Sequence, residues 1–175
     1  MKIVLYIAAS IDGYIARVDG KVDWLDKFTG TEEDYGYYDF YENIDALIMG
    51  SNTYKEILNF DVDWPYAGKP TYVVSNSSPS SDNEDVILIP NDLEGVMKIL
   101  EENNHKVVWL VGGGRLVSST MSMNLIDEII LSIMPTTLGD GIRLFNSSKD
   151  FDLDYSLAKC ETYKNGVVQI HYVKK

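Results

Sequence analysis

Residues 107–121 read VVWLVGGGRLVSSTM, in which an apolar, β-branched run meets three consecutive glycines and then a segment of helical character. A helix that starts directly after a strand presents backbone N–H groups that can bind an anion, and missing side chains would let a pyrophosphate approach closely. The stretch is not the dinucleotide fingerprint G-x-G-x-x-G, because Val117 stands where the third glycine should fall. From these residues alone, a phosphate-binding turn and a tight, closely packed strand-to-helix turn are equally favoured.

The alternation of strand and helix signals along the chain predicts an α/β fold. Short apolar runs typical of buried parallel strands lie at 2–9, 45–50, 71–75, 86–90 and 107–111. Segments with helical signals lie at 51–58, 91–100 and 114–123. After Asn124 the pattern changes to antiparallel strands, with a hairpin turn at Asn165-Gly166. We therefore expect one domain over 1–175, a mostly parallel α/β core closed by an antiparallel C-terminal hairpin.

The composition of the 175-residue chain narrows the function classes. The chain has a net charge of −12 and therefore lacks the excess of basic residues that binds nucleic-acid phosphates, so no nucleic-acid partner is expected. Without a membrane-length apolar run or a secretory signal, we expect a cytoplasmic protein with no membrane partner. The single cysteine, Cys160, cannot form an internal disulfide, and its alternating segment predicts a small core residue. His105 and His171 lack partners at metal-ligand spacing, which predicts no metal site.

Small polar residues follow several of the predicted strands. Ser10, Asp12 and Gly13 follow the first strand, SNT follows at 51–53, and SNS at 75–77. Each group alone is typical of ordinary turns and helix caps. Because the carboxyl ends of parallel strands meet at one edge of an open α/β sheet, the groups together with the three glycines favour a shared polar crevice.

Five motifs, taken in order, make the chain similar to the dihydrofolate reductase superfamily: AASIDGYIA, IMGSNTY, KPTYVVSNSS, VVWLVGGGRL and PTTLGDGIRLF. More closely, it resembles the reductase domain of bacterial riboflavin biosynthesis, the C-terminal domain of the bifunctional deaminase-reductase, and its stand-alone relatives. The resemblance covers Lys2 to Val173. It implies a dihydrofolate-reductase-like, three-layer α/β/α fold, NADPH bound in extended form across the strand ends, and a homodimer.

The resemblance assigns the cofactor to the strand exits and implies a cis peptide bond between Gly112 and Gly113 that lies against it. It also places Asp12 at the nicotinamide, although an Asp-Gly turn former is the other interpretation of this residue. Ser51 stands where dihydrofolate reductases usually have an arginine for the extra phosphate of NADPH, so NADH stays open beside NADPH. The implied cofactor-binding set is Ala9, Asp12, Gly50, Ser51, Asn52, Thr53, Ser75, Asn76, Val111, Gly112, Gly113, Gly114, Arg115 and Leu116.

Asp34 is the catalytic acid that the resemblance implies, because it lies sixteen positions before Gly50, as the acid does in dihydrofolate reductases. Ser132 matches the hydroxyl residue that supports this acid. The residues themselves also allow a structural role, since Thr31 and Asp34 fit a helix capping box. Four aromatic neighbours that could stack a flat heterocycle favour the site role; they are Trp24, Tyr35, Tyr38 and Tyr41.

Trp24, Tyr38 and Lys69 are the implied substrate-binding residues. Lys69 stands in place of the arginine that clamps the folate tail, and a lysine cannot reproduce its bidentate fork. We therefore expect an NADPH-dependent reductase of a heterocycle, most similar to 5-amino-6-(5-phosphoribosylamino)uracil reductase. The alternatives are a dihydrofolate reductase and, in another class, a non-catalytic nucleotide- or drug-binding module.

Overall fold

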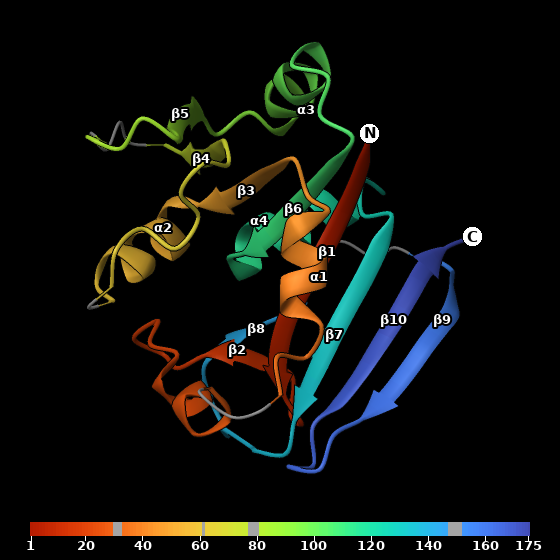
Figure 1. Cartoon of the computed structure of the whole chain (residues 1–175). Coiled ribbons are helices and arrows are strands. Elements are labelled where there is room, and N and C mark those ends of the chain that lie inside the picture. Colours follow the sequence, from red (N-terminus) through yellow and green to blue (C-terminus); the bar gives the residue numbers. More distant parts are fainter. Residues whose placement is uncertain (30–32, 61, 77–80, 147–151) are drawn as a thin grey trace.

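The structure is a computed structural model that describes residues 1–29, 33–60, 62–76, 81–146 and 152–175 (Figure 1). Thr31 and Ser77, named above, lie outside the described residues. Within the described ranges, no helix is long and apolar enough to cross a membrane. The elements are β1 (Lys2–Ser10), β2 (Tyr14–Ala16), a 3-10 helix (Asp23–Phe28), α1 (Tyr37–Glu42), β3 (Ala46–Gly50), α2 (Ser51–Leu58), β4 (Thr71–Ser75), β5 (Val86–Pro90), α3 (Leu93–Glu102), β6 (Val107–Gly112), α4 (Gly114–Ser122), β7 (Glu128–Met134), β8 (Ile142–Arg143), β9 (Tyr155–Thr162) and β10 (Val168–Lys174).

One eight-stranded sheet forms the centre of the domain, in the order β5-β4-β3-β6-β1-β7-β10-β9. The strands from β5 to β7 all run parallel to their neighbours, whereas β10 is antiparallel to β7 and β9 is antiparallel to β10. A separate two-stranded antiparallel sheet pairs β2 with β8. The predicted mostly parallel sheet with an antiparallel C-terminal pair is therefore confirmed.

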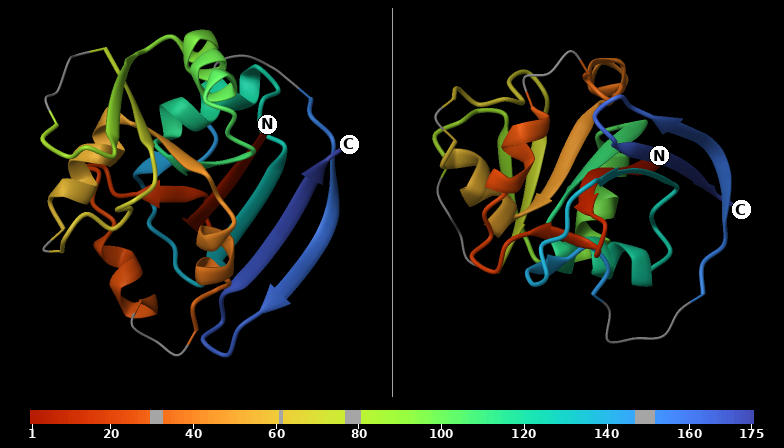
Figure 2. Two further views of the ribbon diagram at one scale, coloured as in Figure 1. Left: turned by 45° about the horizontal axis from the view of Figure 1, so that its top comes forward. Right: turned by 90° about the horizontal axis from the view of Figure 1, so that it is seen from below.

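Helices cover both faces of the parallel part of the sheet (Figure 2). In β3 the buried side chains alternate, with Ala46 and Ile48 in one core and Leu47 and Met49 in the other. The first core includes apolar residues of α3 and α4, and the second includes residues of α1 and α2. Strands buried on both faces need continuous apolar sequences, which explains the runs in the chain. The three-layer α/β/α arrangement is confirmed.

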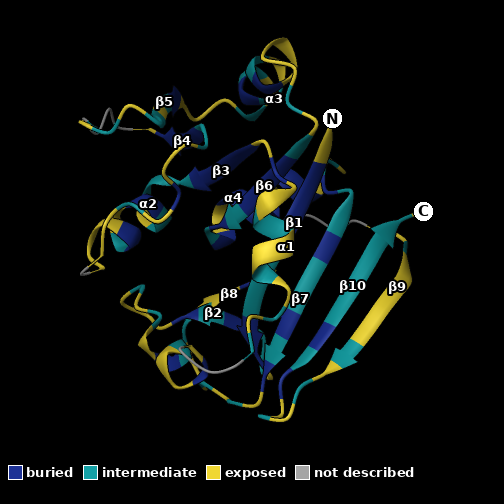
Figure 3. Cartoon of the chain, in the orientation of Figure 1, coloured by how far each residue is buried: buried dark blue, intermediate teal, exposed yellow. Residues whose placement is uncertain are grey.

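The C-terminal hairpin turns at Asn165-Gly166, where the Tyr163 N–H donates to the Val167 carbonyl at 2.9 Å and Gly166 has a φ of 87°. Strand β9 is the outer strand of the sheet, and most of its side chains are exposed (Figure 3). Cys160 is consequently exposed, and the prediction that it is a core residue is wrong. An alternating sequence indicates burial of one face only where another layer covers that face.

Candidate active site

The carboxyl ends of β3 and β6 bring two helix N-termini side by side. The strands are neighbours in the sheet, with Met49 opposite Gly112; α2 begins directly after Gly50 and α4 directly after Gly113. A Cβ added to Gly113 would lie 3.1 Å from Thr53 Oγ1 and 3.9 Å from the Gly50 Cα. Neither helix has a side-chain cap. The first-turn N–H groups of both helices therefore lack intrahelical acceptors and point toward one region, which suits an anion.

Glycine is required at positions 112, 113 and 114 for different physical reasons. Gly112 and Gly113 have φ angles of 146° and 93°, which other residues rarely adopt. Gly114 is constrained by the protein itself, because a Cβ there would lie 2.6 Å from the Arg143 carbonyl oxygen of β8. For this residue the closely packed turn is the right interpretation. The expected cis bond is wrong, since the described residues contain no cis peptide bond; the left-handed φ angles make the sharp turn instead.

The surface beside the two helix N-termini offers open space and positive charge. A Cβ added to Gly50 would have no atom within 4 Å, and Arg115 is exposed. Across the described part of the chain, Arg115 makes no ion pair. Ser51 and Asn52 begin α2 at this edge. The structure thus brings residues 50–53 and 113–115 of the predicted cofactor set together.

The other predicted cofactor residues lie at the ends of the neighbouring strands β4 and β1 or in the cores under this edge of the sheet. Ser75 is buried at the end of β4, and the exposed Asn76 follows it. Ala9 is buried near the end of β1. Leu116 and Val111 pack into the cores on opposite faces of the sheet, so only their backbone could face a cofactor.

Asp12 connects the segment after β1 to the loop after β7 through hydrogen bonds. Its carboxylate accepts hydrogen bonds from Ser10 Oγ at 2.6 Å, from the Gly139 N–H at 2.7 Å and from the Leu138 N–H at 3.1 Å. The Ser10 hydroxyl, followed by these backbone donors, lowers the pKa of Asp12 to about 2. Both carboxylate oxygens are used by the protein, which favours a structural role over a role at the nicotinamide.

A buried polar cluster lies deeper between β1, β7 and β10. Gln169 Nε2 donates to Ser132 Oγ at 3.0 Å and to the Tyr35 carbonyl at 2.9 Å, and the Tyr6 hydroxyl donates to the same carbonyl at 3.0 Å. Burial raises the pKa of Tyr6 above its usual range, so its hydroxyl stays a donor. Sequence reasoning found Ser132 but missed Tyr6 and Gln169. A glutamine between two β-branched apolar residues of β10, Val168 and Ile170, was the available signal.

Asp34 lies immediately before Tyr35 of this cluster in the chain and three positions before the start of α1. Its Oδ1 accepts the Gly36 N–H at 3.0 Å, and its Oδ2 lies 3.4 Å from the Tyr38 nitrogen, which donates to it. Because α1 begins only at Tyr37, Asp34 precedes the helix and does not occupy the third helical position that a capping box requires. The carboxylate is exposed and stabilises the helix start directly.

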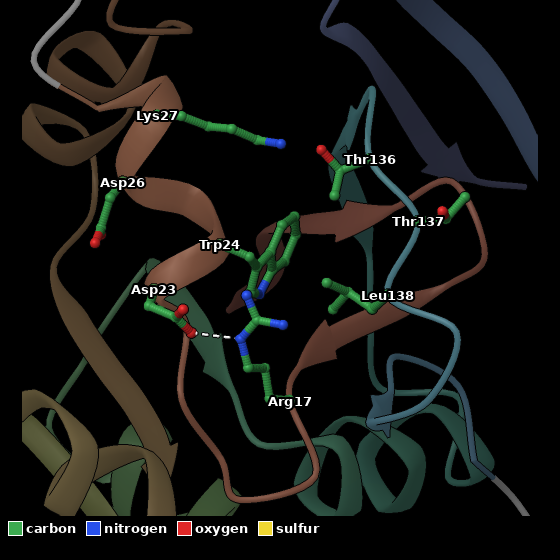
Figure 4. A pocket seen from close by; sticks show the side chains of 8 residues that line it. All are labelled: Arg17, Asp23, Trp24, Asp26, Lys27, Thr136, Thr137 and Leu138. Atoms are coloured by element: carbon green, nitrogen blue, oxygen red, sulfur yellow. Dashed lines mark hydrogen bonds and ion pairs between the residues drawn. The ribbon is translucent and has the colours of Figure 1, made fainter.

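The predicted substrate residues are not brought together. Trp24 is buried beside a hollow of about 390 Å³ between the 3-10 helix and the segment that follows β7 (Figure 4). Tyr38 is exposed on α1. Lys69 Nζ donates to the Ile44 carbonyl at 2.6 Å and lies 4.9 Å from the centre of the Tyr41 ring. Because Lys69 precedes β4 and Ile44 precedes β3, this lysine lies at the amino edge of the sheet, away from the strand exits.

Comparisons with known sequences point to one family. The sequence model of the RibD C-terminal domain matches residues 1–169. The chain is 38% identical over 174 residues to the uncharacterized protein YwjB of Bacillus subtilis (strain 168), covering 99% of this chain and 98% of YwjB. It is 33% identical over 182 residues to the uncharacterized protein YyaP of the same organism, covering 98% of this chain and 94% of YyaP.

Solved structures agree with the sequence matches. A structure from Shewanella sp. PV-4, named for riboflavin biosynthesis, has a TM-score of 0.90 and 33% identity, covering 100% of this chain and 99% of that one. A deaminase/reductase of Thermotoga maritima has a TM-score of 0.74 at 14% identity, a likeness of fold alone; 99% of this chain matches 56% of that longer protein. The family match spans nearly the whole domain, and we conclude that the chain belongs to the RibD C-terminal domain family, the reductase domain family of riboflavin biosynthesis.

Proposed function

We propose that the chain is an NADPH-dependent reductase of a heterocyclic substrate, of the 5-amino-6-(5-phosphoribosylamino)uracil reductase type. The observation that carries this proposal is the pair of helix N-termini without side-chain caps at the carboxyl ends of β3 and β6. Backbone N–H groups fit the pyrophosphate of a dinucleotide, and Arg115 supplies a cation beside them. The chain belongs to the reductase domain family of riboflavin biosynthesis, which supports the choice of substrate class.

The sheet order gives an extended cofactor a direction. From β4 to β1 the edge crosses β3 and β6, a width of about 14 Å at the usual strand spacing. The adenosine end would lie near Ser75 and Asn76, and the nicotinamide end near Ala9 on β1. When bound, NADPH would supply the hydride. Residues 50–53 and 113–115 would hold its phosphates in register with the substrate.

The polar cluster beneath this edge would orient the substrate and the proton donor. Gln169 donates to both Ser132 Oγ and the Tyr35 carbonyl, and this fixes the peptide between Tyr35 and Gly36, one residue after Asp34. The backbone donors of α1 hold the Asp34 carboxyl group in one place at the surface. From there Asp34 would deliver a proton directly or through water, with Ser132 as its support.

The alternatives make different use of the same crevice. A dihydrofolate reductase needs a clamp for the folate tail, and Lys69 is bound to Ile44 at the opposite edge of the sheet. The structure therefore favours the uracil-type substrate. A non-catalytic binding module would keep the helix N-termini and bind the nucleotide without turnover.

The deciding experiment follows the near-ultraviolet absorbance of NADPH with and without the phosphoribosylaminouracil substrate, alongside calorimetric titration of NADPH. We expect saturable NADPH binding and substrate-dependent oxidation. Binding without oxidation would support the binding module, and oxidation with dihydrofolate alone would support the runner-up enzyme. A protein that does not bind NADPH at all would contradict the proposal.

The proposal includes a homodimer. Strand β7 carries the apolar sequence IILSIM, and several of its side chains are only partly buried. Leu157 on the outer strand β9 and Phe145 after β8 are exposed apolar side chains. A second copy that covered such surfaces would remove them from water, which favours association.

A further inference from the structure

The backbone between Asp34 and α1 has a conformation that is unusual for its sequence. The Tyr37 N–H donates to the Asp34 carbonyl at 2.9 Å, which closes a turn over residues 34–37. The two central residues, Tyr35 and Gly36, have φ angles of 55° and 76°. Turns with two left-handed central residues are normally built from glycine, asparagine or aspartate, so a tyrosine is unfavourable there. Such a residue persists only where its surroundings hold it in place.

The peptide between Tyr35 and Gly36 links the buried polar cluster to Asp34. Its carbonyl oxygen accepts hydrogen bonds from Gln169 Nε2 at 2.9 Å and from the Tyr6 hydroxyl at 3.0 Å. Its N–H donates to Asp34 Oδ1 at 3.0 Å. Because a peptide unit is planar, anchoring the carbonyl also fixes the direction of the N–H. The orientation of this one peptide therefore sets where the Asp34 carboxylate is held.

The tip of the C-terminal hairpin holds the side chain of Tyr35. Asn165 Nδ2 donates to the Tyr35 hydroxyl at 2.5 Å, and this hydroxyl donates to the Phe28 carbonyl at 3.2 Å. The Tyr163 ring meets the Tyr35 ring edge-on, with the ring centres 4.9 Å apart. Asn165 lies 130 positions after Tyr35 in the chain, yet the hairpin tip lies beside the turn before α1 (Figure 2).

The hairpin tip is itself fixed. The Gly166 N–H donates to the Tyr163 carbonyl at 2.9 Å, and Asn165 Oδ1 accepts the Val167 N–H at 3.3 Å. Val167 is fully buried and packs in one apolar cluster with Met134 of β7. The amide oxygen of Asn165 is thus used within the hairpin, and its nitrogen is presented to Tyr35.

We propose that Tyr35 is a positioning residue for Asp34, and that Asn165 keeps Tyr35 in the left-handed conformation that this role requires. The tip of the C-terminal hairpin then affects the reaction from a distance, because it holds the residue whose peptide binds the acid. Both residues act through Asp34 and not on the substrate. That Asp34 is the proton donor rests on the proposed function, whereas the hold on its carboxylate does not.

Two variants remove this hold in different ways. Asn165→Ala removes the amide donor, and Asn165 does not have a positive φ, so alanine adopts its backbone conformation without strain. Tyr35→Phe keeps the ring against Tyr163 but removes the hydroxyl that bonds to Asn165 and Phe28. Lys164→Ala is the matched control, because it truncates the neighbouring, exposed residue of the same hairpin tip.

The first measurement is the hydrogen–deuterium exchange rate of the Gly36 amide, resolved by two-dimensional NMR on the full chain without NADPH or substrate. This amide is protected by its hydrogen bond to Asp34. We expect several-fold faster exchange in Asn165→Ala and in Tyr35→Phe, and the parent rate in Lys164→Ala. Unchanged exchange in the first two variants, or equal acceleration in all three, would overturn the positioning role.

The second measurement is the kcat for NADPH oxidation with the phosphoribosylaminouracil substrate. Asn165→Ala should lower kcat by roughly 10–100-fold, as expected when a reacting group is displaced by about 1 Å, while the Kd for NADPH stays within about twofold of the parent. In an Asp34→Asn background, the same change should lower kcat by less than about twofold, because the group that it positions is already absent. A fall of equal size in both backgrounds would overturn the inference.

The outcomes separate this inference from the proposed function. If the exchange of Gly36 responds as expected but the parent does not oxidise NADPH, the hold on Asp34 stands and the reductase function fails. If the parent oxidises NADPH and Asp34→Asn is equally active, the reductase function stands and Tyr35 positions no catalytic acid.

Discussion

The Gly50→Ala variant tests whether glycine is required at this position for binding of the cofactor or for the fold. The φ of Gly50 is −78°, which alanine adopts freely, and an added Cβ meets no atom within 4 Å. The methyl group would project into open space beside the N-termini of α2 and α4. If a pyrophosphate occupies that space, only the ligand meets the new group.

The expected stability change is small because two effects oppose each other. Alanine is a poorer helix N-cap than glycine, at a cost of roughly 0.5–1 kcal/mol. The same change removes freedom from the unfolded chain and returns about 0.4–1 kcal/mol. The free energy of unfolding should therefore stay within about 0.5 kcal/mol of the parent. In the complex, an overpacked methyl group costs about 1–3 kcal/mol, which is roughly 5–150-fold in the Kd for NADPH.

Gly114→Ala is the opposite control. Its Cβ would lie 2.6 Å from the Arg143 carbonyl oxygen, so the protein must shift whether or not NADPH is present. We expect a loss of about 1–3 kcal/mol in the free energy of unfolding. Urea unfolding gives the stability of each variant, and calorimetry gives the NADPH affinity of the folded proteins. Parent-like NADPH affinity in a stable Gly50→Ala variant would refute the placement of the cofactor over this turn.

Three further predictions concern the acid, a structural carboxylate and assembly. Asp34→Asn should leave the melting temperature nearly unchanged, because asparagine also caps helices, while turnover falls by roughly 10²–10⁴; parent-like rates would leave Asp34 as a cap only. Asp12 has a pKa lowered from 3.8 to about 2, so its stabilising effect is present above pH 3.8 and is lost as the pH falls toward 2. The free energy of unfolding of Asp12→Asn, measured as the pH is lowered, should lack that part of the pH dependence. A pH dependence equal to that of the parent would contradict a stabilising hydrogen bond between Ser10 and Asp12. Sedimentation velocity at micromolar concentration should show a homodimer, and a monomer alone would remove the assembly proposal.

The fold was largely predictable because its signals are local. The continuous apolar runs follow from burial of the parallel strands on both faces, and Asn165-Gly166 encodes the hairpin turn. The error at Cys160 arose because nothing in its alternating sequence shows that β9 is the outermost strand. Sheet order is a property of distant pairings, which local periodicity does not contain.

The candidate site was predictable only where it follows strand exits. Gly50 and Gly113 could be placed at the same edge of the sheet because parallel strands end there, whereas their direct adjacency follows from the pairing of β3 with β6. The reason for Gly114 could not be found from the sequence, since its neighbour Arg143 lies 29 positions further along the chain. Gln169 and Tyr6 join Ser132 through tertiary hydrogen bonds, and the position of Lys69 at the opposite edge is likewise a tertiary fact.

Hydrogen–deuterium exchange with and without saturating NADPH tests most directly whether the paired N-termini of α2 and α4 form the cofactor site. The first-turn amides of both helices lack side-chain caps, so phosphate oxygens bound there should slow their exchange. We expect the strongest protection in peptides that cover residues 50–54 and 112–117. If saturating NADPH left the exchange of both peptides unchanged, or protected only other parts of the chain, the result would contradict the central claim.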